Sequence, residues 1–176
     1  MGNSKFVDKF TMFASKLGNE VHLRSLRDAF ATIMPLYILA GLAVLINNTV
    51  FQWLLSGDTL TGAQYWGTLI VNGTLNISSL LIAPVIGYML SQNKGYENPL
   101  AAAVISLATL VVMMPNTVSI TPVGAEEGVM VQGALTFSNV GTGAMFAGVI
   151  IGLAATELFI WIEGVNNFVS MEFEFS

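Results

Sequence analysis

Amides and hydroxyls gather in the segment NGTLNIS, residues 72–78, which interrupts an otherwise apolar part of the chain. Asn72 and Asn76 are four residues apart, so on a helix they would share one face. At membrane depth, such groups would each cost on the order of kilocalories if lipid surrounded them. They must therefore form hydrogen bonds between helices or line the path of a polar solute. The same reasoning covers three hydroxyl residues: Thr74, Ser78 and Ser79.

The segment also reads as two N-glycosylation sequons, at Asn72 and Asn76, and a third begins at Asn47. A glycan cannot lie in hydrocarbon, and a three-residue sequon is frequent by chance. We therefore reject glycosylation as the meaning of these residues.

Titratable side chains are few, and two lie where they could act. Glu157 is the acidic residue inside the apolar run AATELFIW, where a charge at the centre of a span would cost at least about 2.5 kcal/mol. It is either a ligand for a proton or solute, or an acceptor of hydrogen bonds from a neighbouring helix or the basic N-terminal segment. His22 precedes the first apolar run and is interpreted as a surface or interface residue rather than a phosphorylated histidine. Glu126 and Glu127 are expected in a solvated turn.

No catalytic, cofactor-binding or metal-ligating residue is predicted. The sequence has no glycine-rich phosphate loop with its lysine, and His22 has no plausible triad partner. One histidine and no cysteine argue against a zinc site of the usual type. Nucleic-acid binding is not expected, because no basic residue follows Lys94. We expect no cofactor, enzyme status stays open, and the substrate-binding residues are unknown.

Composition places the chain in a membrane. Of its 176 residues, 54% are apolar and 10% are charged, against about 25% charged in soluble domains. The sequence predicts an all-α polytopic membrane protein with about four spans, near residues 29–51, 66–92, 98–114 and 140–162. The polar centre of the second span could divide it into two half-helices, which would make five.

The N-terminal segment 1–28 is predicted to lie at the cytoplasmic surface. Phe6, Phe10, Phe13 and Leu17 follow helical spacing and form the apolar face of an amphipathic, interfacial helix. Five of the six basic residues lie in the first 27 positions. By the positive-inside rule the N-terminus and the loop at Lys94 are therefore cytoplasmic. Segments 55–65 and 116–139 become outer loops, and the second could hold a small β-hairpin.

Small residues recur every fourth position in the last predicted span, at Ala144, Gly148 and Gly152, with Gly141 on nearly the same face. Such a ridge lets two helix backbones approach closely. We interpret it as a packing surface, against a helix either of the same chain or of another copy.

The chain resembles the N-terminal part of the membrane IIC component of phosphotransferase-system (PTS) sugar permeases, in the lactose/cellobiose/chitobiose group. The resemblance covers nearly all of residues 5–168. Four stretches carry it: HLRSLRDAFATIMPLYILAGLAVLINN at 22–48, VNGTLNISSLLIAPVIGYMLS at 71–91, NPLAAAVISLATLVVMMP at 98–115 and GAMFAGVIIGLAATELFIWI at 143–162. Their order and spacing are more specific than any one of them.

The resemblance implies a function and partners. IIC components carry a disaccharide such as cellobiose, chitobiose or lactose across the bacterial inner membrane, while IIA and IIB proteins relay phosphate to it. Family members are homodimers whose N-terminal spans build the interface. Residues 29–168 would then be an interface domain.

The sequence departs from the family in length. Full members are more than twice as long, and the C-terminal transport domain that holds the sugar is not represented, so no sugar-binding residue is carried over. The tail 169–176 is atypical. Three hypotheses follow: an interface part of a sugar permease; an independent small membrane protein that acts as scaffold or regulator of a full-length permease through the Gly148 and Gly152 ridge; or a small channel lined by Asn72, Thr74 and Asn76.

Overall fold

The computed structural model describes residues 20–174, so the predicted amphipathic helix at residues 4–20 lies outside the described part except for Glu20. The first element is helix α2, Val21–Leu45. The Glu20 side chain caps it by accepting hydrogen bonds from the backbone N–H groups of His22 and Leu23. The helix therefore begins eight residues before the predicted span at residue 29, and Pro35 lies in its interior.

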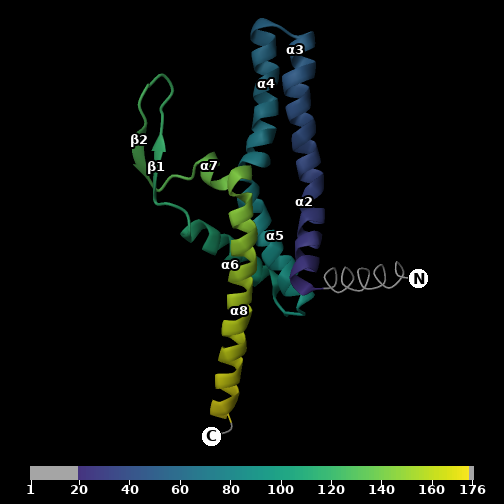
Figure 1. Cartoon of the computed structure of the whole chain (residues 1–176), viewed down its shortest axis with the longest axis vertical. Coiled ribbons are helices and arrows are strands. Elements are labelled where there is room, and N and C mark those ends of the chain that lie inside the picture. Colours follow the sequence, from purple (N-terminus) through teal and green to yellow (C-terminus); the bar gives the residue numbers. More distant parts are fainter. Residues whose placement is uncertain (1–19, 175–176) are drawn as a thin grey trace, which may run out of the picture.

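Helix α2 continues without interruption into a π-helical turn, Ile46–Val50, and then into the short helix α3, Phe51–Leu54. The chain reverses at once, and helix α4, Gly57–Asn72, returns beside α2 and α3 as an antiparallel hairpin (Figure 1). Gly57 has a φ of 61°, a backbone conformation that glycine adopts without a steric penalty. Most of the predicted outer segment 55–65 is helical rather than a loop, because α4 begins at Gly57.

The second predicted span does divide at its polar centre. Helix α4 ends at Asn72, a 3₁₀ turn covers Leu75–Ile77, and helix α5 runs over Ser78–Asn93. The stretch from Gly57 to Asn93, which includes the break, is 37 residues long.

Helix α6, Pro99–Val112, has Pro99 in its first turn and Asn98 as its cap, where the Asn98 side chain accepts from the Ala101 N–H. Its 14 residues extend over about 21 Å, short of a bilayer core of about 30 Å. After residues 113–136, the short helix α7 (Phe137–Val140) and a 3₁₀ turn (Thr142–Ala144) lead into helix α8, Met145–Glu174. Within residues 20–174, three helical stretches rather than the predicted four are long and apolar enough to cross a membrane.

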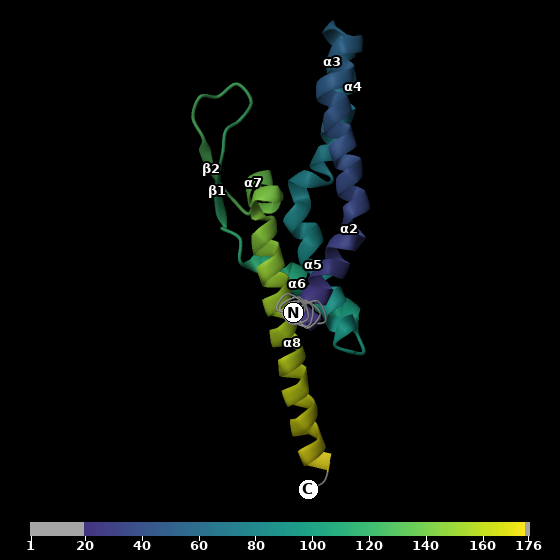
Figure 2. The ribbon, with the colours of Figure 1, turned by 45° about the vertical axis from the view of Figure 1, so that its right-hand side comes forward.

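The predicted hairpin in the outer segment is confirmed. Strand β1, Thr117–Ile120, pairs antiparallel with strand β2, Val129–Gln132. Val118 lies opposite Val131, and Ile120 opposite Val129. Figures 1 and 2 both show this hairpin standing away from the helices.

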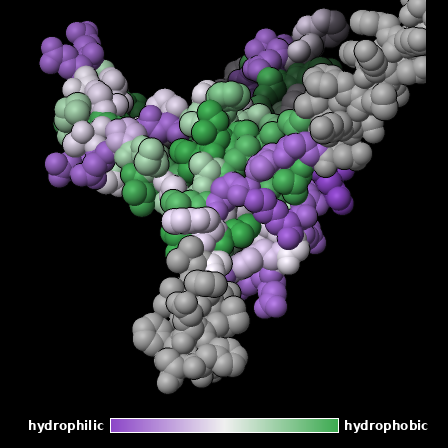
Figure 3. Space-filling view, turned by 60° about the horizontal axis from the view of Figure 1, so that its bottom comes forward, coloured by the Kyte–Doolittle hydropathy of each residue, from purple (hydrophilic) through white to green (hydrophobic). Residues whose placement is uncertain are grey.

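Helix α5 lies at the centre of the packed region, in contact with α2, α6 and α8. A hydrophobic cluster joins Ala29 and Ile33 of α2 to Ile82 and Ile86 of α5. In the view onto the lower end of the molecule, hydrophilic residues gather beside hydrophobic surface rather than covering it (Figure 3). That distribution is typical of a protein whose apolar surface faces lipid.

Candidate functional site

The polar segment at the α4–α5 break satisfies its own hydrogen bonds. Asn76 Nδ2 donates to Asn72 Oδ1 over 2.7 Å, and Thr74 Oγ1 donates to the Ile70 carbonyl over 2.6 Å. Ser78 Oγ donates to the Leu75 carbonyl over 2.7 Å. The prediction that Asn72 and Asn76 share one helix face is wrong, because the break separates them; their amides meet across it. This internal pairing favours the hydrogen-bonding interpretation over the wall of a solute path.

One hydroxyl of the segment reaches a distant part of the chain. Ser79 is fully buried, and its Oγ donates to the carbonyl of Val140 over 2.8 Å. Val140 is the last residue of α7, five residues before α8 begins at Met145. The bond therefore ties the start of α5 to the start of α8, as the interhelical interpretation expects.

The glycine ridge of α8 packs against α5 of the same chain. A Cβ placed on Gly148 would lie 3.0 Å from the Ser79 carbonyl oxygen, and one on Gly152 would lie 2.8 Å from the Ala83 carbonyl oxygen. The distance at Gly152 is shorter than a carbon–oxygen contact allows, and the distance at Gly148 is at the limit, so the close approach depends on glycine. The ridge therefore packs against a helix of the same chain, one of the two arrangements predicted for it, and the scaffold or regulator hypothesis stays a prediction.

A second close contact, which sequence reasoning missed, joins α5, α6 and α8. A Cβ on Gly87 would lie 2.4 Å from Ser106 Oγ. Ser106 Oγ in turn lies 3.0 Å from Thr156 Oγ1, and Thr156 donates to the Gly152 carbonyl over 2.8 Å. Ser106 and Thr156 are both fully buried. The sequence pattern that could have indicated this contact is the spacing of Gly152 and Thr156, which lie one helical turn apart.

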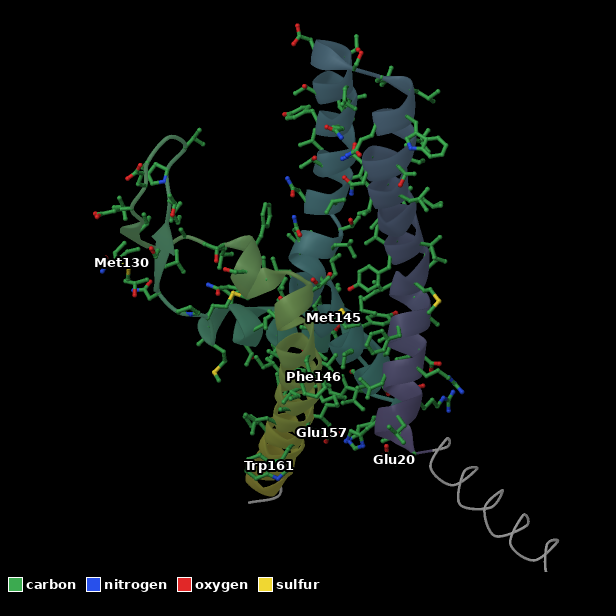
Figure 4. All side chains as sticks on the ribbon, turned by 45° about the horizontal axis from the view of Figure 1, so that its top comes forward. Glu20, Met130, Met145, Phe146, Glu157 and Trp161 are labelled. Atoms are coloured by element: carbon green, nitrogen blue, oxygen red, sulfur yellow. The ribbon has the colours of Figure 1, made fainter. Side chains whose placement is uncertain are left out.

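Charged side chains meet at one end of the helices (Figure 4). Glu157 of α8 forms an ion pair with Lys94, which follows α5, and its Oε1 lies 2.6 Å from His22 Nε2 of α2. The other ring nitrogen of His22, Nδ1, lies 2.5 Å from Glu20 Oε1. Glu157 is thus an acceptor from neighbouring elements, one of its two predicted roles, and His22 is an interface residue.

The hydrogen bond to His22 also acts on Glu20. Together with the backbone N–H groups that Glu20 caps, it lowers the pKa of this exposed carboxyl from 4.5 to about 2. An imidazole between two carboxylates donates to both only when both of its nitrogens carry a proton. The cluster therefore joins three elements through charged groups.

An amide pair, also missed from the sequence, joins the π-helical turn that follows α2 to helix α4. Asn47 Nδ2 donates to the Gln64 carbonyl over 3.2 Å, and Gln64 Nε2 donates to the Asn47 carbonyl over 3.1 Å. Asn47 lies in the π-helical turn, and its Oδ1 is buried without a hydrogen-bond partner. It faces Gly67, where a Cβ would lie 2.4 Å away. Gly67 is needed to admit the amide between the helices.

The remaining predicted positions carry no site in the described part of the chain. Glu126 and Glu127 are exposed in the turn between the two strands, as expected. Residues 20–174 contain no group of three or more His, Asp or Glu side chains that could hold a metal ion. The polar groups described above serve packing, so the architecture defines a helical membrane domain held by glycine contacts and buried hydrogen bonds.

The particular family follows from comparison with known proteins. Residues 27–173 match the family described as "Phosphotransferase system, EIIC". The chain belongs to this family, and the resemblance drawn from its four sequence stretches is confirmed.

Individual relatives agree with this assignment. The chain is 29% identical over 160 residues to the lichenan permease IIC component of Bacillus subtilis (strain 168), covering 89% of this chain and 35% of the relative. It is 28% identical over 162 residues to the cellobiose-specific EIIC component of Geobacillus stearothermophilus, covering 86% and 34%. The crystal structure of the transporter ChbC, the IIC component for N,N'-diacetylchitobiose, superposes with a TM-score of 0.73 at 25% identity, covering 89% of this chain and 37% of ChbC. The chain spans about a third of the length of these relatives.

Proposed function

We propose that this chain is the interface part of the IIC component of a phosphoenolpyruvate-dependent sugar phosphotransferase system that imports a β-linked disaccharide such as cellobiose, chitobiose or lactose. The observation that carries the proposal is the match of both sequence and helix arrangement to cellobiose- and chitobiose-type IIC components. The dense packing of α5, α6 and α8 suits a domain that anchors a moving transport domain. The sugar would be bound by residues outside this chain.

The proposal includes partners and an orientation. IIA and IIB proteins would supply the phosphate, and two copies of the chain would form a homodimer in the bacterial inner membrane. Arg24, Arg27 and Lys94 lie at one end of the helices, beside Asp28 and Glu157. The positive-inside rule makes that end, and the N-terminus with it, cytoplasmic.

The proposal is tested by uptake of radiolabelled cellobiose and chitobiose in cells that lack their own permease and are supplied with IIA and IIB. One strain expresses this chain alone. A second expresses it with the remaining two thirds of a cellobiose-type relative as a separate polypeptide, and a third expresses that polypeptide alone. We expect uptake only in the second strain.

Each other result contradicts the proposal in a different way. Uptake by this chain alone would show that a sugar site lies within residues 1–176. No uptake in any strain, with insertion of both polypeptides verified, would favour the independent scaffold or regulator, and inhibition of an intact permease by this chain would establish that alternative.

A further inference from the structure

The β-hairpin has two chemically different faces. Successive residues of a strand point to opposite faces of a sheet, and the register pairs Val118 with Val131 and Ile120 with Val129. One face is therefore entirely aliphatic and β-branched, formed by Val118, Ile120, Val129 and Val131. The opposite face is mostly polar, formed by Thr117, Ser119, Met130 and Gln132.

The aliphatic face is largely uncovered in the single chain. Val118 is 7% exposed, but Val129 is 55% exposed, and the hairpin stands clear of the helices in both ribbon views (Figures 1 and 2). A two-stranded hairpin on its own is marginally stable at best in water and needs a surface to pack on. Neither strand carries a lysine, an arginine or a proline, the residues that commonly protect a free strand edge. The hairpin therefore lacks a partner surface.

A groove beside the base of the β-hairpin is open in the single chain. It has a volume of about 220 Å³ and lies between the end of α6 and the start of α8. Leu110, Met113, Ala147 and Ile151 supply its apolar wall, and methionine side chains adapt readily to the shape of a partner. The hairpin leaves the end of α6 at Pro115, on the rim of this groove, but extends away from the helices.

We propose that the aliphatic face of the hairpin packs into this groove on a second copy of the chain, and that the second copy returns the same contact. The proposal rests on the homodimer of the proposed function and names the surface that forms it. Two copies in one membrane share orientation and depth, and the hairpin starts at Pro115 on the rim of the groove, so the base of one hairpin lies near the level of the other copy's groove. A two-fold axis along the membrane normal then makes the exchange reciprocal.

Lipid is a poor occupant for the same face. The strand edges have unpaired backbone N–H and carbonyl groups, which do not occur against hydrocarbon. The hairpin tip carries Glu126 and Glu127, both exposed, and charges there would oppose insertion. A protein surface that leaves the tip in water fits both features.

The test uses the absence of native cysteine, which makes every introduced cysteine a unique reporter. Two differently tagged full-length chains are co-expressed in membranes, one with Met113→Cys in the groove and the other with Val129→Cys on the aliphatic face. The matched control replaces Val129→Cys by Met130→Cys, the next residue along, which is also exposed but lies on the opposite face. We expect oxidative cross-linking between tags to be at least about tenfold greater from position 129 than from position 130.

A second measurement separates this proposal from the homodimer itself. The dimer fraction is counted in membranes by single-molecule photobleaching for the unmodified chain, Val129→Asp and Met130→Asp. We expect dimers that Val129→Asp reduces severalfold and Met130→Asp leaves nearly unchanged. Dimers that both variants leave intact, or equal cross-linking from 129 and 130, would overturn the hairpin contact while the homodimer stands. Monomers in every sample would overturn both, and sugar uptake would still report separately on the permease assignment.

Discussion

The helices α5, α6 and α8 pack far more closely than the hairpin formed by α2, α3 and α4. Between α5 and α8, the Gly152 backbone approaches the Ala83 carbonyl so closely that no side chain fits. In the helical hairpin of α2, α3 and α4, called the outer hairpin below, Gly67 is the one buried residue of α4. Trp53 and Trp66, on the two arms of that hairpin, are 87% and 69% exposed.

The difference shows two ways of joining helices where the hydrophobic effect gives little help. Lipid tails are as apolar as the side chains they replace, so helices associate through close packing and hydrogen bonds. The packed core uses glycine contacts along several turns and adds buried hydroxyls. The outer hairpin uses one reciprocal amide pair at Asn47 and Gln64. Substitutions in the core should therefore lower stability by disturbing the close packing. Substitutions in the outer hairpin should lower it by removing a few hydrogen bonds.

The largest expected effect comes from filling the glycine contact in the core. Gly152→Leu would force a side chain against the Ala83 carbonyl, and the overpacking should destabilise the protein by about 1–3 kcal/mol or more. Thermal unfolding in detergent, followed by tryptophan fluorescence, measures it. Gly164→Leu is the matched control on the same helix, since a Cβ there meets nothing within 4 Å. Equal melting temperatures for the two variants would contradict the packing described.

A smaller effect should follow from removing the buried hydroxyl pair of the core. Thr156→Val keeps the side-chain shape but removes the contact with Ser106 Oγ and the bond to the Gly152 carbonyl. A double-mutant cycle with Ser106→Ala should give a coupling energy of about 0.6–1.7 kcal/mol, the range for hydrogen bonds within membranes. The cycle is measured by unfolding of the four proteins in mixed micelles. Strictly additive single substitutions would show that the two hydroxyls do not interact.

Sequence reasoning found the membrane class, the family and the β-hairpin, because each depends on composition or on a local pattern. It also named a break at the polar centre of the second span as an open alternative, because the amides at Asn72 and Asn76 are costly against lipid. The extent of α4 was missed. Its threonines and glutamine resemble a loop until Gln64 is seen to pair with Asn47, 17 residues away.

The contacts between helices could not be predicted to the same degree. The ridge at Gly148 and Gly152 was recognised as a packing surface, but periodicity does not say which helix fills it. Lys94 and Glu157 are 63 residues apart, and their ion pair depends on how α6 returns the chain past α5. Such pairings depend on the three-dimensional arrangement of the helices, and no local sequence pattern predicts them.

The amide pair of the outer hairpin should matter less, and only locally. Gln64→Leu removes the donor to the Asn47 carbonyl and should cost roughly 1 kcal/mol. Hydrogen exchange followed by mass spectrometry should show faster exchange in residues 46–54 and 57–67, with the α5–α8 contact unchanged. Gln52→Leu, an exposed amide of α3, is the control. Faster exchange throughout α5 and α8 would show that the two regions are coupled rather than separately held.

The smallest expected effect lies at the charged end, through Glu20. Its pKa is about 2 in the folded protein and 4.5 without the fold. Because the folded value is the lower, the ionised carboxylate stabilises the fold above pH 4.5, and this contribution is lost as the pH falls from 4.5 through about 2. Glu20→Gln removes this titration while keeping an oxygen that can cap α2.

The unmodified chain should therefore lose more thermal stability between about pH 5 and about pH 3 than Glu20→Gln does, by a difference on the order of a degree or two in melting temperature. The comparison uses unfolding in detergent across that range, with Glu127→Gln in the exposed hairpin turn as the control. Parallel pH profiles for the unmodified chain and Glu20→Gln would mean that the bond to His22 does not hold this carboxylate in solution. The bond between Glu20 and His22 would then be a local contact at the start of α2, and the joining of α2 with α8 would depend on the contact between His22 and Glu157 alone.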